Sequence, residues 1–260
     1  MIIKEKDLQK IMDRMSEIEL SVSTKSKYEY DGKRVPRVTE VISAMLHEDF
    51  LMKWANNLGF KHISYTAFMR ESADKGTYSH LAIERYLKQG YLDLDSMVEI
   101  PNDRIKQTVC SVMTGFYKWW NLIHNNYKKI EVIYLEETLI HKYFAGTCDC
   151  LLKVDDNYWL IDFKTSNHMN YNYALQLAAY KYLLKELKNI EISRALILRL
   201  DKSNYTYYTY EYDLKNNISH IKFFDDCLQT FMLLNAAFIM RMNTKYQYES
   251  LLKDISTTGE

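Results

Sequence analysis

Two stretches, AGTCD (residues 145–149) and WLIDFKTS (residues 159–166), decide the fold of this chain. The apolar start of the second stretch indicates a buried strand, and side-chain alternation along a strand places Asp162 and Lys164 on the same side. A hairpin joining the two stretches would bring Asp149 close to them. The sequence therefore predicts two carboxylates and one ammonium converging where neighbouring strands meet.

This trio has the composition of a metal-dependent hydrolytic site. Carboxylate and carbonyl oxygens are the ligands of hard divalent cations, and a lysine beside such a cation suits an attacking water or a scissile phosphate. We therefore consider the trio a candidate for phosphodiester hydrolysis. A solvated turn at a strand end is the alternative interpretation of the same residues.

The surrounding pattern predicts an α/β protein. Alternating or continuous apolar runs predict five strands. These are expected over residues 131–141, 143–154, 158–164, 192–200 and 205–212. Helical spacing predicts eight helices. These are expected over residues 4–20, 40–46, 49–58, 63–73, 78–88, 103–126, 170–188 and 216–242. This order favours one central mixed sheet with helices on both faces. We expect a single domain over residues 1–260, with a mainly helical N-terminal elaboration (1–126) and a sheet-containing catalytic core (127–242).

Smaller features accompany these elements. Asp31-Gly32 predicts a short hairpin turn, and Thr39 is the expected N-cap of the second helix. Gly76 is expected to precede a separate helix and to allow close packing against another backbone. Cys148 and Cys150 are expected to pack on one face of their strand as small apolar groups.

Polar pairs at helical spacing are further candidates. His80 and Glu84 lie four residues apart, so they share a helical face; a surface pair is the alternative to a metal-binding histidine. Gln176 and Tyr180 have the same spacing, and they would direct an amide and a hydroxyl at the site or at DNA phosphates. We expect Glu136, rather than its neighbour Glu137, to point to the site.

Composition sets wider limits. The chain has 260 residues, is 47% hydrophobic and carries 34 basic and 34 acidic residues. A net charge of zero neither favours nor excludes nucleic acid, because local fields decide binding. The charged first twenty residues argue against a signal peptide, and the lack of 18 consecutive apolar residues argues against a membrane span. The four cysteines lack paired CxxC spacing, which disfavours a zinc or iron–sulfur site.

We expect a reducing, cytoplasmic location in a bacterial or virus-infected host cell.

The order of the motifs resembles the RecB-type branch of the PD-(D/E)xK nuclease superfamily. The matching pieces are Gly76-Thr-x-x-His80-x-x-x-Glu84, Glu136, Gly146-Thr-x-Asp149, Ile161-Asp162-Phe-Lys164-Thr-Ser166 and Gln176-Leu-Ala-Ala-Tyr180. Pro36-Arg-Val-Thr39 is similar to an element of small exonucleases related to the mitochondrial genome maintenance exonuclease and its phage homologues. The resemblance implies a restriction-endonuclease-like core and a Mg²⁺- or Mn²⁺-dependent DNA nuclease, usually an exonuclease.

The resemblance also implies a role for each site residue. Asp149, Asp162, His80 and the backbone carbonyl of Phe163 would be metal ligands. Lys164 would be catalytic together with the two aspartates. Gln176, Tyr180 and Glu136 would support the site and contact DNA.

Some features depart from the family pattern. Cys148 stands where proline usually precedes the first aspartate, and Asp162 replaces the commoner glutamate. The four-cysteine iron–sulfur staple of some relatives is missing from the sequence, so we expect no such cluster. No GxxxxGK[ST] motif occurs, so unwinding would need a partner; a recombinase, helicase or polymerase is reasonable.

Rival interpretations are a structure-specific endonuclease, a non-catalytic DNA-binding subunit with a nuclease fold, and a sugar- or nucleotide-binding α/β domain. The sequence does not define the oligomeric state.

Overall fold

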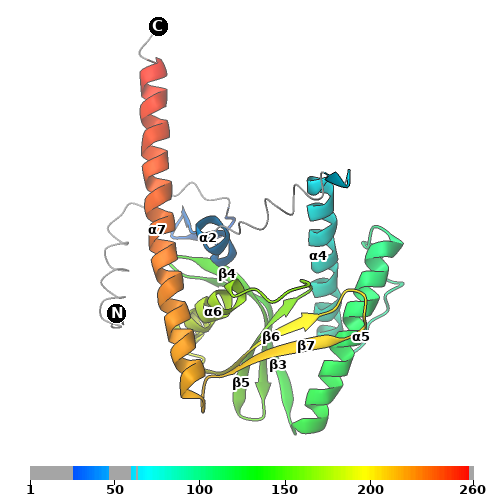
Figure 1. Cartoon of the computed structure of the whole chain (residues 1–260). Coiled ribbons are helices and arrows are strands. Elements are labelled where there is room, and N and C mark those ends of the chain that lie inside the picture. Colours follow the sequence, from blue (N-terminus) through cyan, green and yellow to red (C-terminus); the bar gives the residue numbers. More distant parts are fainter. Residues whose placement is uncertain (1–25, 47–59, 63, 258–260) are drawn as a thin grey trace.

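A five-stranded sheet forms the centre of the molecule (Figure 1). The computed structural model describes residues 26–46, 60–62 and 64–257, with side chains to residue 242. The helices predicted over 4–20 and 49–58 lie outside the described residues.

The sheet follows the chain order from β3 to β7. Its strands are β3 (Ile130–Ile140), β4 (Ala145–Val154), β5 (Asn157–Lys164), β6 (Ile192–Leu200) and β7 (Tyr207–Asp213). Strands β5 and β6 pair in parallel, and the other neighbours pair antiparallel. The parallel pair needs a crossover connection, which helix α6 (Asn172–Lys188) provides. The predicted mixed sheet is confirmed, with all five strands within a few residues of their expected bounds.

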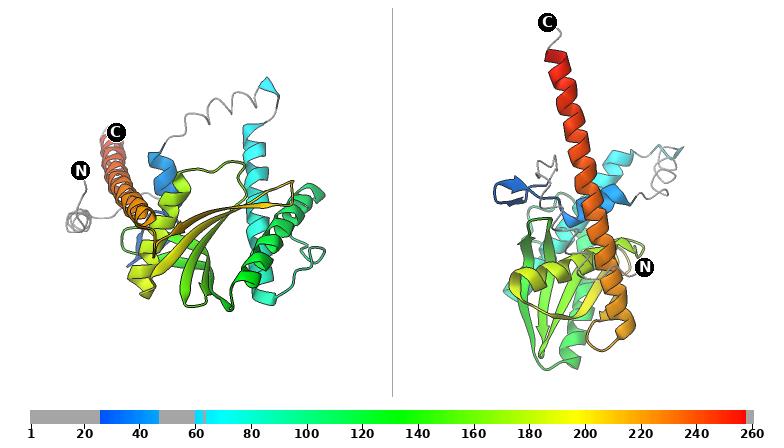
Figure 2. Two further views of the ribbon diagram at one scale, coloured as in Figure 1. Left: turned by 60° about the horizontal axis from the view of Figure 1, so that its bottom comes forward. Right: turned by 90° about the vertical axis from the view of Figure 1, so that its left-hand side faces the viewer.

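Helices cover both faces of the sheet (Figure 2). The layer on one face consists of α6, α7 (Ile218–Thr257) and α2 (Val38–Met45). It packs on strand residues such as Leu160 and Ile197. The opposite layer consists of α4 (Tyr65–Gln89) and α5 (Asp103–Asn126) and packs on residues such as Ile161 and Leu196. Because neighbouring strand residues serve opposite layers, the sheet is buried on both sides, and the predicted α/β class is confirmed.

Helix α4 is longer than predicted. The helices expected over 63–73 and 78–88 are one continuous helix of 25 residues that includes Gly76. A single glycine costs a helix only about 1 kcal/mol, which packing of the helix readily offsets. The close backbone approach predicted at Gly76 is also wrong, because an added Cβ would meet only Thr165 Oγ1, at 3.8 Å.

Two other details differ from the predictions, and a third agrees with them. The N-cap of α2 is Arg37 rather than the predicted Thr39, so the helix begins at Val38, and the Glu40 side chain accepts a hydrogen bond from the Arg37 backbone amide. Helix α7 continues to Thr257, well past the predicted end. The hairpin at Asp31-Gly32 forms as predicted, between β1 (Glu29–Tyr30) and β2 (Lys33–Arg34).

The buried cysteines of β4 do not share a face. Cys148 packs with the α6 and α7 layer, whereas Cys150 packs with the α4 and α5 layer. Between them lies Asp149, and opposite it Glu136, between the register partners of the two cysteines, has a φ of 50°. The prediction that both cysteines lie on one face is therefore wrong, because the distortion at Asp149 and Glu136 interrupts the regular alternation of side chains along β4.

In the part of the chain that the structure describes, one segment is long and apolar enough to span a membrane by length and composition alone. It is Ile218–Met242 of α7, in which an 18-residue window has a mean hydropathy of 1.2 and is 44% buried. Phe224, Phe231 and Phe238 of this segment pack in the core against the sheet. A core helix passes the same test, so the segment is weak evidence for a membrane.

Candidate active site

The two predicted aspartates lie opposite each other on the β4–β5 hairpin. Cys150 pairs with Ile161, so the register brings Asp149 and Asp162 together one step further along the strands. Asp162 is 1% exposed and Asp149 is 9% exposed. Asp149 Oδ2 accepts a hydrogen bond from the backbone amide of Phe163 at 2.8 Å. Two carboxylates therefore share one buried end of the hairpin.

Lys164 joins this pair through a chain of polar contacts with α6. Its Nζ lies 2.5 Å from Asp162 Oδ2 and donates to Gln176 Oε1 at 3.2 Å. The Gln176 amide nitrogen in turn donates to the Tyr180 hydroxyl at 3.2 Å. The ammonium also lies 5.0 Å from the centre of the Tyr173 ring. Helix α6 therefore places two side chains, Gln176 and Tyr173, against Lys164.

The sequence interpretation missed Tyr173. Its spacing of three residues before Gln176 and seven before Tyr180 places it on the same helical face. That spacing was available in the sequence, but a single aromatic residue on an amphipathic helix gives no signal of its own.

His80 reaches the same place from the opposite layer. Its Nε2 lies 3.1 Å from the Phe163 carbonyl oxygen. Its Nδ1 lies 3.6 Å from Glu136 Oε1 and 3.7 Å from Asp149 Oδ2. Because a metal-binding histidine usually donates its second ring N–H to a carbonyl or carboxylate, this orientation leaves Nδ1 as the free ligand atom. The Phe163 carbonyl, predicted as a metal ligand, already accepts this hydrogen bond.

The glutamate expected at the site is present. Glu136 lies beside His80, whereas Glu137 forms an ion pair with Lys188 at 2.7 Å. Glu84, which shares a helical face with His80, pairs with Lys88. It also lines a groove together with His80 and Glu136. The structure thus brings together all eight residues predicted for the site, from α4, β3, β4, β5 and α6.

The donor set suits a divalent cation. Single ligand atoms of His80, Glu136 and Asp149 all lie within 4.8 Å of one another. Both oxygens of Asp162 are buried without a hydrogen-bond partner, although the Lys164 ammonium is close. A buried charge with so few partners is costly, and hard cations prefer oxygen ligands. The residues therefore fit a divalent cation bound between the carboxylates and the imidazole.

Electrostatics at the site reflect this excess of negative charge. Burial alone would lower the pKa of His80, but the Asp149 carboxylate and then Glu136 raise it to about 9. Burial raises the pKa of Asp162 above its ordinary value, against the opposing effect of Lys164. The pKa of Lys164 is raised despite burial, because Asp162 and Asp149 favour the ammonium. At neutral pH, protonated His80 and Lys164 partly neutralise the acids.

Gly146 allows Tyr180 to lie against β4. An added Cβ at Gly146 would lie 2.5 Å from Tyr180 Cε1. We expect Gly146→Ala to lower the free energy of unfolding by about 1–3 kcal/mol, because overpacking a core forces side chains to shift. Gly76→Ala is the matched control and should stabilise the protein by about 0.5–1 kcal/mol, because helical alanine is favoured over glycine. Urea unfolding of both variants checks this; equal effects would contradict it.

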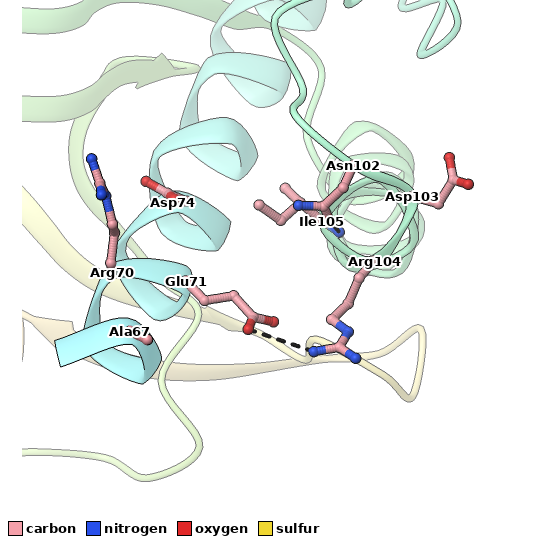
Figure 3. Close-up of a pocket in the computed structure, with 8 residues that line it drawn as sticks. All are labelled: Ala67, Arg70, Glu71, Asp74, Asn102, Asp103, Arg104 and Ile105. Carbon is pink, nitrogen blue, oxygen red and sulfur yellow. Dashed lines mark hydrogen bonds and ion pairs between the residues drawn. The ribbon is translucent and has the colours of Figure 1, made fainter. Parts of the chain in front are cut away.

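Two grooves flank His80 and have different charge. One is lined by His80, Glu84 and Glu136 among others and is acidic. The other has Lys164 and Lys202 among its lining residues and no carboxylate. A third groove lies farther along α4, where Glu71 and Arg104 form an ion pair at 3.6 Å across to α5 (Figure 3).

Comparison with known proteins gives one family. A family model described as the PD-(D/E)XK nuclease superfamily matches residues 58–249, a range that contains every site residue named above. No curated protein matches the chain. A solved structure described as the crystal structure of SSO0001 is 11% identical, covers 87% of this chain and 84% of that chain, and has a TM-score of 0.30. A likeness this weak supports no argument about the site.

Proposed function

The chain belongs to the PD-(D/E)XK nuclease superfamily, and from this premise we propose that it is a Mg²⁺- or Mn²⁺-dependent deoxyribonuclease. Its mixed sheet flanked by helices is consistent with the restriction-endonuclease-like fold of that superfamily. The observation that carries the proposal is the meeting of His80, Glu136 and Asp149 beside the buried Asp162–Lys164 pair.

Each residue has a distinct task in this proposal. Asp149, Asp162 and His80 would hold the cation, with Glu136 close enough to contribute. A bound divalent cation supplies charge stabilisation at the phosphate and lowers the pKa of a water. Lys164 would orient the attacking water or stabilise charge that develops on the phosphate.

Helix α6 would act as the support. Gln176 holds the Lys164 ammonium, and Tyr180 holds the Gln176 amide. This Gln-x-x-x-Tyr pair, with His80 as an added ligand, supports placement in the RecB-type branch. The branch in turn favours an exonuclease on single strands or DNA ends, working in replication, recombination or repair.

A cleavage assay tests the proposal. Linear and circular DNA, single- and double-stranded, would be followed over time with Mg²⁺, Mn²⁺ or a chelator. We expect metal-dependent loss of linear single strands or of DNA ends, while closed circles persist. Equal cutting of circles would favour the structure-specific endonuclease. Binding without metal-dependent cleavage would favour the non-catalytic subunit.

Metal binding should release a proton from His80. With a pKa of about 9, His80 is protonated at neutral pH, and a cation can bind only the neutral imidazole. We therefore expect metal affinity to rise with pH up to about 9, with release of about one proton near neutral pH. Calorimetry of Mn²⁺ binding in buffers of different ionisation enthalpy measures this release. His80→Ala should abolish it, and His124→Ala, on the exposed end of α5, should not. Unchanged release in His80→Ala would show that another group supplies the proton.

A further inference from the structure

The basic groove beside His80 has the chemistry of a phosphate-binding track. Its lining includes Lys164, Lys202 and the hydroxyl-bearing side chains Ser72, Thr165 and Ser166. Ammonium and hydroxyl groups are common ligands of phosphate oxygens. The groove on the other side of His80 contains Glu84 and Glu136, which would repel a phosphate. The basic groove would therefore attract a polyanion such as DNA, and the acidic groove would repel it.

The loop that carries Lys202 is anchored to α5. Ser111 Oγ donates to the Asp201 carbonyl and accepts from the Tyr205 amide, both at 3.0 Å. Lys118 Nζ donates to the Tyr205 carbonyl at 2.7 Å. Gly115 allows close approach, because an added Cβ would lie 2.5 Å from the Thr206 carbonyl oxygen. The β6–β7 loop therefore presents Lys202 from a defined position.

The positive charge of Lys202 is only weakly neutralised by the residues that the structure describes around it. Among the described residues, it forms no ion pair. The adjacent Asp201 carboxylate accepts backbone hydrogen bonds from Ser203 and Asn204 at 2.9 Å. Burial lowers the pKa of Lys202, and Lys75 lowers it further. Lys75 itself pairs with Glu71 at 2.7 Å. An anion in the groove would relieve this repulsion.

Helix α4 adds two exposed side chains, one of which lines this groove. Tyr65 and Met69 are 37% and 41% exposed, and Met69 lines the groove. Tyr65, Met69, Ser72, Gly76 and His80 follow one another at spacings of three or four residues, so they form one face of the helix. That face is about 22 Å long, at 1.5 Å per residue. Tyr65 lies one helical turn beyond Met69 on that face, outside the groove lining. Exposed aromatic side chains close to a basic groove are typical of proteins that bind single strands, because unpaired bases can stack on them.

We propose that this groove binds single-stranded DNA next to the scissile phosphate, with Lys202 contacting a neighbouring backbone phosphate and Tyr65 stacking on a base. The inference rests on the proposed nuclease function and adds to it the groove that holds the strand and the side of the site from which the strand approaches. In duplex DNA the base faces stack on one another, so Tyr65 could not stack on a base there.

Binding in the absence of cleavage tests the groove. The probe is a fluorescent single-stranded oligodeoxynucleotide, titrated in Ca²⁺ over a range of salt concentrations. One phosphate contact contributes about 0.7 to the slope of log K against log salt for a single strand. Lys202→Ala should therefore make the slope shallower by about 0.7, and Lys202→Arg should restore it. Lys222→Ala, the same charge change on exposed α7, should leave slope and affinity unchanged. Tyr65→Ala should weaken single-strand binding by roughly fivefold or more without changing the slope.

The outcomes separate the two proposals. Wild-type slope and affinity in Lys202→Ala, or an equal loss in Lys222→Ala, would overturn the groove while metal-dependent cleavage by the wild type stands. An equal effect of Tyr65→Ala on blunt duplex would overturn the single-strand assignment. Failure of the wild type to cleave any DNA with Mg²⁺ or Mn²⁺ would instead remove the nuclease proposal.

Discussion

Asp162→Asn protein is expected to lose turnover by roughly a hundredfold or more, because charge stabilisation at such sites is worth a few kcal/mol per group. The Asp162 carboxylate is 1% exposed, and the Lys164 ammonium is the one cation that pairs with it among the described residues. The amide keeps the shape of the side chain and removes the charge that would attract a cation. The loss should therefore appear both in cleavage and in metal binding.

The thermal shift on adding Mn²⁺ gives a readout separate from activity. A cation at a hundred times its Kd stabilises the folded state by about 2.7 kcal/mol. Wild type should show this shift and Asp162→Asn should lose most of it. Asp156→Asn, an exposed site in the turn at the far end of the same hairpin, is the matched control and should behave as wild type. Near-wild-type cleavage by pure Asp162→Asn would remove the metal-site proposal.

The parts of the site that follow from periodicity could be predicted from the sequence. Strand alternation placed Asp162 and Lys164 together, and their Nζ–Oδ2 contact is 2.5 Å. Helical spacing paired Gln176 with Tyr180, and the structure joins them by a hydrogen bond. The meeting of His80 with the hairpin required more, because nothing local shows that α4 crosses the strand ends. The order of motifs within a known family supplied that link.

Other features depend on tertiary contacts that leave no local pattern. Gly76 looks like a helix break, but packing keeps α4 continuous, whereas Gly146 has a steric requirement set by a ring more than thirty residues away. Lys202 belongs to a polar loop and resembles any surface lysine until Ser111 and Gly115 of α5 are seen to position that loop. The periodicity of a sequence therefore does not predict where distant segments approach each other closely.

Lys164→Ala should lower turnover by roughly a hundredfold or more while leaving metal binding largely intact. Lys164 contributes no ligand atom, so the Mn²⁺-dependent thermal shift should persist in this variant, in contrast to Asp162→Asn. Lys164→Arg should not restore turnover, because Asp162 Oδ2 and Gln176 Oε1 hold a compact ammonium that is only 18% exposed, and a planar guanidinium has a different shape. Tyr180→Phe, which removes one hydroxyl at the end of the same hydrogen-bonded chain, should lower turnover much less.

Single-turnover cleavage and thermal shift would be measured on all three variants. Loss of the Mn²⁺ shift in Lys164→Ala would mean that the lysine acts by maintaining the metal site, and full activity of Lys164→Arg would mean that positive charge alone is sufficient.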